Sequence, residues 1–177
     1  AGKLSVVGSG PKDAYDRALP YLEALGTGVS YVGEGETARM VKICHNVFLG
    51  VVAASLAEVT ILAEKNGVPR HAFLDFMNKS VMGSMFTRYK SPAYVNLDFT
   101  PAFTSVLLRK DMDLGLSAAH DLDVPMPVAS TVREILQTLI GNGFAETDFA
   151  AMIALQAKNS GMTIKPDGVE VSDGLEG

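Results

Sequence analysis

The sequence predicts a mainly α-helical protein, in which an all-helical domain follows a short βαβ piece of an α/β fold. Two short strand patterns, at residues 3–8 and 29–33, enclose one helical stretch. After the second strand, apolar residues recur at helical spacing, and Gly or Pro ends each run. We therefore predict a mixed region over residues 1–34, an all-helical domain over 35–162 and a polar tail over 163–177.

The mixed region begins with a β-branched strand, and Pro11 then starts a helix at a position where a missing N–H costs nothing. We predict that Pro20 divides this helix, residues 13–25, into two short pieces and that Gly26 ends it. Two strands separated by a helix form a right-handed crossover of a parallel sheet, but two strands alone do not make a stable sheet. The pattern is typical of the last part of a larger α/β domain.

The all-helical region divides at its glycines and prolines. Its first helix is predicted at residues 36–66, where small residues permit close contacts with other helices: Gly50, Ala53, Ala54 and Ala57. Further helices are predicted at 69–78, from a Ser80 cap to about 90, at 102–121 after the start signal Thr100-Pro101, at 128–140 and at 148–159, with a loop at 91–99. The apolar face of the 102–121 helix is predicted to hold Phe103, Val106, Leu107, Leu114 and Ala118.

Composition limits the classes of function. Hydrophobic residues make up 47% of the chain and charged residues 20%, which is enough for a packed core. The net charge of −5 provides no basic surface for nucleic acid or an anionic membrane, so we expect neither partner. The apolar run 47–63 approaches the length of a membrane span, but Ser55, Glu58 and Thr60 interrupt it, which favours a central bundle helix.

A single cysteine, Cys44, excludes an intrachain disulfide framework and suits a reducing cytoplasm, the location that we expect. We predict that Cys44 is a small buried packing residue. No signal-peptide pattern starts at Ala1. His71 and His120 match no metal-ligand spacing, so we expect no metal site and place both histidines at the surface or at helix caps.

A polar stripe lies near the start of the long helix, directly after a Gly-x-Gly loop. Residues three and four apart share a helix face, so one side of this helix carries Arg39, Lys42, His45 and Asn46. The guanidinium of Arg39 does not deprotonate in proteins and cannot be a base. Arg39 is as well explained by an exposed ion pair with Glu36 as by a functional role in the stripe.

The combination of Gly-x-Gly with Lys-x-x-His-Asn, here Gly33, Gly35, Lys42, His45 and Asn46, resembles the active-site helix of the β-hydroxyacid dehydrogenases. This family includes 3-hydroxyisobutyrate and 6-phosphogluconate dehydrogenases. The resemblance implies that Lys42 is the general acid/base and that Asn46 holds the substrate hydroxyl or carboxylate. His45 either has a similar role or is a buried, hydrogen-bonded side chain. Gly35 would then contact the cofactor.

The resemblance extends to Phe103 and to Leu107-Leu108-Arg109-Lys110-Asp111, which look like the Phe and the Lys-Asp helix of the family. It implies that Lys110 and Phe103 lie by the cofactor and that Asp111 braces the fold. From the residues alone, such a charged cluster on an amphipathic helix is more often a solvated face. The fold implied is an all-helical, 6-phosphogluconate dehydrogenase-like C-terminal domain, preceded by the last βαβ piece of a Rossmann-type NAD(P)-binding domain.

The resemblance also places the main cofactor loop upstream of these residues. Gly33-x-Gly35-x-x-Ala38 has the spacing of a dinucleotide fingerprint, but helix replaces the strand that should end in an acidic residue about twenty positions later. We therefore expect NAD or NADP to be bound mainly by segments outside this sequence. We also expect these residues alone to be inactive.

Oxidation of a small β-hydroxyacid needs a base for the hydroxyl proton, and the reverse reaction needs an acid. We expect burial, the positive end of the helix and nearby Arg39 to make Lys42 suitable for both. Arg39 stands where the family usually has its Lys, but the residues after Lys42 match the continuation of the family motif.

The alternative to a dehydrogenase is a non-catalytic helical oligomerisation module whose polar stripe is structural. In both cases we expect a homodimer or higher homo-oligomer.

Overall fold

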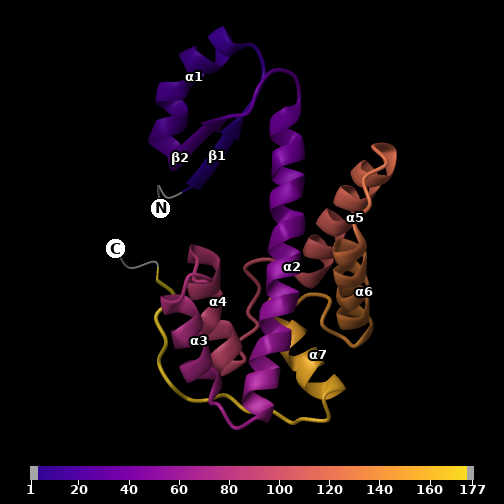
Figure 1. Cartoon of the computed structure of the whole chain (residues 1–177). Coiled ribbons are helices and arrows are strands. Elements are labelled where there is room, and N and C mark those ends of the chain that lie inside the picture. Colours follow the sequence, from indigo (N-terminus) through magenta and orange to yellow (C-terminus); the bar gives the residue numbers. More distant parts are fainter. Residues whose placement is uncertain (1–3, 175–177) are drawn as a thin grey trace. The chain divides into compact units, whose positions relative to one another are not determined.

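The computed structural model describes residues 4–174 of the chain (Figure 1). It divides into two compact units, residues 1–48 and 49–177, and each unit is described by itself. Helix α2, Thr37–Lys65, runs through the division between them. Lys3, predicted in the first strand, and residues 175–177 of the predicted tail lie outside the described residues. The domain bounds predicted from the sequence stay predictions.

The first unit holds β1 (Leu4–Gly8), α1 (Lys12–Leu25), β2 (Gly26–Tyr31) and the beginning of α2. The two strands pair in parallel, with Val6 opposite Val29, as the crossover pattern predicts. Strand β2 begins directly after α1, three residues earlier than predicted. This early pairing requires a glycine at position 26, because a Cβ there would collide with the carbonyl oxygen of Leu4.

The prediction that Pro20 divides the first helix is wrong. Helix α1 is continuous, with Pro20 inside it. A proline in a helix interior removes one backbone hydrogen bond and costs about 3 kcal/mol. Helix α1 packs against both strands, and the ring of buried Tyr15 lies 4.8 Å from the ring of Tyr31. This packing keeps the helix in one piece.

Ser9 ties the end of β1 to the start of α2. Its hydroxyl donates a hydrogen bond to the carbonyl oxygen of Gly35 (2.7 Å) and accepts one from the backbone N–H of Ala38 (3.1 Å). The first N–H groups of a helix have no partner within the helix, so Ser9 caps α2 from far upstream in the chain. The N–H of Gly10 also donates to the carbonyl oxygen of Gly33 (3.0 Å). These contacts determine where α2 and its polar stripe begin.

The second unit is helical. It contains the rest of α2, α3 (Arg70–Lys79), α4 (Met85–Asn96), α5 (Ser105–Asp121), α6 (Pro127–Gly141), the 3₁₀ turn η1 (Phe149–Ala151) and α7 (Met152–Asn159). Helix α3 packs against α4, and α5 packs against α6 (Figure 1). Small residues of α2 are buried, and a Cβ on Gly50 would come within 2.9 Å of the sulfur of Met112. The predicted close approach of α2 to other helices is confirmed.

Helix α2 is long and apolar enough to cross a membrane by length and composition. Half of its most apolar 18-residue window is buried inside the structure. Such burial is typical of a core helix, and it supports the interpretation of α2 as a central bundle helix.

The predicted helix end near residue 90 is wrong, and the predicted loop over 91–99 is wrong for residues 91–96, which are helical, and confirmed for residues 97–99. Helix α4 starts after Ser84, whose hydroxyl accepts a hydrogen bond from the N–H of Thr87, and it continues past Pro92 to Asn96. Tyr94 and Val95, beyond the proline, are fully buried. The Tyr94 hydroxyl donates to the carbonyl oxygen of Ala53 (3.1 Å), so burial and this contact with α2 hold the last turn helical.

The predicted start of the next helix at residue 102 is also wrong. Helix α5 begins at Ser105, and the hydroxyl of Thr104 caps it by accepting the N–H of Leu107. The N–H groups of Ala102 and Phe103 instead donate to the carboxylate of Asp148. A distant side chain therefore delays the helix that Thr100-Pro101 indicates.

The buried face of α5 differs from the predicted one. Leu107 and Leu114, expected inside, are 45% and 47% exposed, whereas Leu108 and Met112 are fully buried. The pattern of apolar residues on α5 is compatible with either face, and the contact with α6 selects one of them.

A C-terminal strap, residues 162–174, runs along α3 and α4 (Figure 1). The guanidinium of fully buried Arg70 donates to the carbonyl oxygen of Lys165 and to the carboxylate of Asp167 (2.9 Å). The backbone N–H of His71 also donates to Asp167 (3.0 Å). The segment predicted as a polar tail is thus held by a buried cation.

Burial of Asp167 would raise the pKa of its carboxyl group, but hydrogen bonds from Arg70 and His71 outweigh burial and lower it below 3.8. A lowered folded-state pKa means that Asp167 stabilises the fold above the usual pKa of the unfolded chain. That stabilisation is lost as the pH falls through the lowered value.

We predict that Asp167→Ala lowers the free energy of unfolding by about 3 kcal/mol at pH 7, because it leaves the buried charge of Arg70 without its main partner. Glu170→Ala, at an exposed position on the same strap, should change it by no more than about 0.5 kcal/mol. Urea unfolding from pH 7 to pH 3 would measure both. The difference between parent and Asp167→Ala should shrink below pH 3.8, and a pH-independent difference would contradict the assignment.

Candidate active site

The polar stripe lies on an exposed part of α2. The Lys42 Nζ donates a hydrogen bond to the Oδ1 of Asn46 at 3.0 Å, and the Nδ1 of His45 lies 3.1 Å from the same oxygen. The spacing of four residues between Lys42 and Asn46 produces the first contact, as expected on a helix. The structure therefore brings together the three residues predicted to be catalytic.

Arg39 is the fourth member of the predicted stripe. Its guanidinium forms an ion pair with Glu36 at 2.9 Å, and both side chains are more than three-quarters exposed, at 77% and 79%. The interpretation of Arg39 as a surface ion-pair partner of Glu36 is confirmed. Arg39 therefore pairs with Glu36, whereas Lys42 and His45 both contact Asn46.

Two expectations about burial are wrong. Cys44 is exposed, not a buried packing residue. Lys42 is also exposed, so burial does not act on its amine in this chain. Among residues 39–48 only Val47 is buried, because β1, β2 and α1 pack mainly on one another.

Gly35 lies in the loop before α2 with a positive φ of 72°, a conformation that favours glycine. Apart from its two chain neighbours, no residue places a heavy atom within 4 Å of the position that a Cβ would occupy there. The backbone at this helix start is therefore open to close approach by a ligand, which fits the predicted cofactor contact.

The second predicted set lies in the helical unit. The Lys110 Nζ forms an ion pair with Asp111 at 2.8 Å, and Lys110 is 57% exposed whereas Asp111 is 12% exposed. The ring of half-buried Phe103 packs edge-on against Phe149, with 5.9 Å between ring centroids. An exposed ammonium can contact a phosphate, and a partly open aromatic ring can contact a nucleotide ring. The exposed ammonium of Lys110 and the partly exposed ring of Phe103 are therefore groups that can contact a dinucleotide.

Sequence analysis missed the most buried ion pair of the helical unit. Lys90, 4% exposed, bonds both carboxylate oxygens of Asp148, which is 2% exposed, at 2.7 and 2.8 Å. The two residues are 58 positions apart, so no local spacing could indicate the pair. Asp148 was predicted as the start of a helix, and it does cap the turn η1 by accepting the N–H of Ala150.

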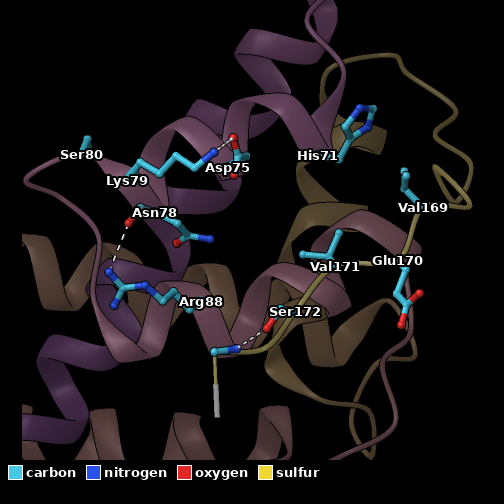
Figure 2. Close-up of a pocket in the computed structure, with 11 residues that line it drawn as sticks. His71, Asp75, Asn78, Lys79, Ser80, Arg88, Val169, Glu170, Val171 and Ser172 are labelled. Atoms are coloured by element: carbon cyan, nitrogen blue, oxygen red, sulfur yellow. Dashed lines mark hydrogen bonds and ion pairs between the residues drawn. The ribbon is translucent and has the colours of Figure 1, made fainter. Parts of the chain in front are cut away.

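A cavity of about 620 Å³ opens between the strap, α3 and α4 (Figure 2). Three of its charged side chains have local partners: Lys79 pairs with Asp75 at 2.7 Å, and Arg88 donates to the carbonyl oxygen of Asn78 at 3.2 Å. The predicted site residues are not among its lining residues, which are His71, Asp75, Asn78, Lys79, Ser80, Arg88, Val169, Glu170, Val171, Ser172 and Gly174. Within residues 4–174, no group of three His, Cys, Asp or Glu side chains could hold a metal ion.

The sequence matches a family model described as NAD-binding of NADP-dependent 3-hydroxyisobutyrate dehydrogenase over residues 33–156. Glyoxylate/succinic semialdehyde reductase 2 of Arabidopsis thaliana is 28% identical over 160 residues, covering 90% of this chain and 45% of that protein. L-threonate dehydrogenase of Escherichia coli K12 is 30% identical over 155 residues, covering 87% of this chain and 51% of that protein.

A solved structure is also similar. The crystal structure of 3-hydroxyisobutyrate dehydrogenase from Salmonella typhimurium matches with a TM-score of 0.80 and 28% identity, covering 87% of this chain and 54% of that chain. The chain spans about half the length of the curated relatives that it matches. The family model covers most of the chain, including the polar stripe of α2 and the Lys110-Asp111 pair, and the chain belongs to the β-hydroxyacid dehydrogenase family typified by 3-hydroxyisobutyrate dehydrogenase.

Proposed function

We propose that this chain forms part of an NAD(P)-dependent oxidoreductase that acts on a small β-hydroxyacid, or on its semialdehyde or keto form. The observation that carries the proposal is the contact between Lys42 and Asn46 on the exposed stripe of α2. The names of the relatives support this substrate class, because they include a reductase of glyoxylate and succinic semialdehyde and a dehydrogenase of L-threonate.

The residues of the stripe have separate roles in this proposal. A bound nicotinamide would accept or supply the hydride. The Lys42 Nζ takes the hydroxyl proton during oxidation and returns it during reduction. Asn46 orients that nitrogen through its Oδ1, without titrating, and holds the substrate hydroxyl or carboxylate. His45, whose Nδ1 lies 3.1 Å from the same oxygen, shares with Asn46 the role of holding the substrate.

Three residues are proposed to contact the dinucleotide. The open backbone of Gly35 admits close approach, the ring of Phe103 offers an apolar surface, and the ammonium of Lys110 offers charge to a phosphate. Asp111 is mostly buried and paired with Lys110, which supports its role as a brace of the helix.

Homo-oligomer formation and a cytoplasmic location belong to the same proposal. Large apolar side chains on α2 support the first, because Phe48 is 68% exposed and Leu62 is 70% exposed. Burial of such side chains against a second copy would remove apolar surface from water. The single cysteine supports a reducing compartment.

We predict that Lys42→Arg lowers turnover in the full-length natural protein by about two to four orders of magnitude, because arginine keeps the charge but does not release a proton. Lys42→Ala should be similarly inactive. Lys79→Arg is the matched control, since Lys79 is an exposed lysine that also bonds an acceptor four residues away, and it should keep parental turnover. More than about a tenth of parental turnover in Lys42→Arg would move the role to His45.

We predict that Lys110→Ala raises the apparent Michaelis constant for the cofactor more than it lowers turnover at saturation, because Lys110 contacts the cofactor and not the reacting atoms. Steady-state kinetics with NADH and NADPH would measure both constants. Lys158→Ala, at another exposed lysine of the helical unit, is the control. Equal cofactor constants in Lys110→Ala and the parent would return Lys110 to the solvated face.

A further inference from the structure

The buried carboxylate of Asp148 joins three segments of the helical unit. It accepts hydrogen bonds from the Nζ of Lys90 on α4 and from the N–H of Ala150 in η1. Its Oδ2 also accepts the N–H groups of Ala102 and Phe103, each at 3.2 Å. One side chain therefore holds two consecutive N–H groups of the connector that leads into α5.

A buried ion pair is weak evidence of added stability, because the cost of removing both charges from water can exceed their attraction. The pair of Lys90 and Asp148 has a more specific effect. Ala102 and Phe103 lie outside the regular helices, so their N–H groups need an acceptor from elsewhere in the chain. Asp148 supplies that acceptor, and Lys90 supplies the countercharge that allows a carboxylate to remain there.

The same network determines the position of the Phe103 ring. The Lys90 Nζ lies 4.4 Å from the centroid of the Phe149 ring, and that ring meets Phe103 edge-on at an interplanar angle of 87°. The N–H of Phe149 donates in turn to the carbonyl oxygen of Phe103 (3.2 Å). Both the backbone and the ring of Phe103 are thus held from the side of Asp148 and Phe149.

We propose that Lys90 and Asp148 are positioning residues for the cofactor: they hold the backbone of Ala102 and Phe103 so that the Phe103 ring is presented to the dinucleotide. The inference rests on the proposed cofactor contact at Phe103. Asp148 acts through the hydrogen bonds that it accepts, and Lys90 acts through Asp148. Neither residue needs to touch the cofactor.

Two double variants separate the hydrogen-bond acceptor from the charge. Lys90→Met/Asp148→Asn removes the ion pair but keeps an acceptor oxygen for the two N–H groups. Lys90→Met/Asp148→Ala removes the ion pair and the acceptor. Binding of NADH and NADPH to the full-length natural protein, followed by the fluorescence of the cofactor, gives a readout besides activity. Phe103→Ala is measured in parallel.

We expect the alanine double variant to bind the reduced cofactor about tenfold more weakly than the parent, as Phe103→Ala does, because a displaced contact group loses its effect. The asparagine double variant should bind within about threefold of the parent, below the tenfold step that 1.4 kcal/mol represents. Parental affinity in the alanine double variant, with weakened binding in Phe103→Ala, would overturn the positioning role and leave the proposed function intact. Parental affinity in Phe103→Ala would overturn both the positioning role and the proposed cofactor contact.

Hydrogen exchange tests the inference without any variant. In the parent, the amides of Ala102 and Phe103 should exchange about as slowly as those within α5, although they precede its first turn. Rapid exchange at both amides would overturn the positioning role, even if the alanine double variant fails to fold.

Discussion

The carboxylate of Asp148 is the constraint that ties three segments of the helical unit together. Through Lys90 it is joined to α4, through Ala150 to the turn before α7, and through Ala102 and Phe103 to the start of α5. A carboxylate in such a place must have its lone pairs satisfied, because an unpaired buried charge is very costly. The connector depends on Asp148 in turn. Ala102 and Phe103 lie outside the regular helices, and their N–H groups donate to this carboxylate.

The stripe on α2 follows a different physical rule. Lys42, His45 and Asn46 meet because of helix geometry alone, so their contact needs no tertiary packing. The residue at which α2 starts, in contrast, depends on contacts with the rest of the first unit. Ser9, held at the end of β1, accepts the N–H of Ala38 and so determines which turn of α2 carries Lys42.

The strap shows how a polar, glycine-containing segment can be ordered without a hydrophobic face. Arg70 is fully buried and directs its guanidinium to the backbone of Lys165 and to the carboxylate of Asp167. Asn96 adds a second attachment by donating to the carbonyl oxygen of Val169 (2.9 Å). The low apolar content of this segment led to the prediction of a tail. Its docking could not be predicted, because Arg70 lies 95 and 97 positions away from Lys165 and Asp167 in the sequence.

The sequence by itself determined what local physics controls: the helical class, the parallel strand pair, the extent of α2 and the contact between Lys42 and Asn46. It also identified Lys110 and Asp111 as a pair on one helix. Only the tertiary structure decided the features that oppose local preference. Helices α1 and α4 continue through Pro20 and Pro92 because packing outweighs one lost hydrogen bond, and α5 starts late because Asp148 holds the N–H groups before it. Exposure of Cys44 and burial of Lys90 depend on which elements lie nearby, and that information is not present in the spacing of residues along the chain.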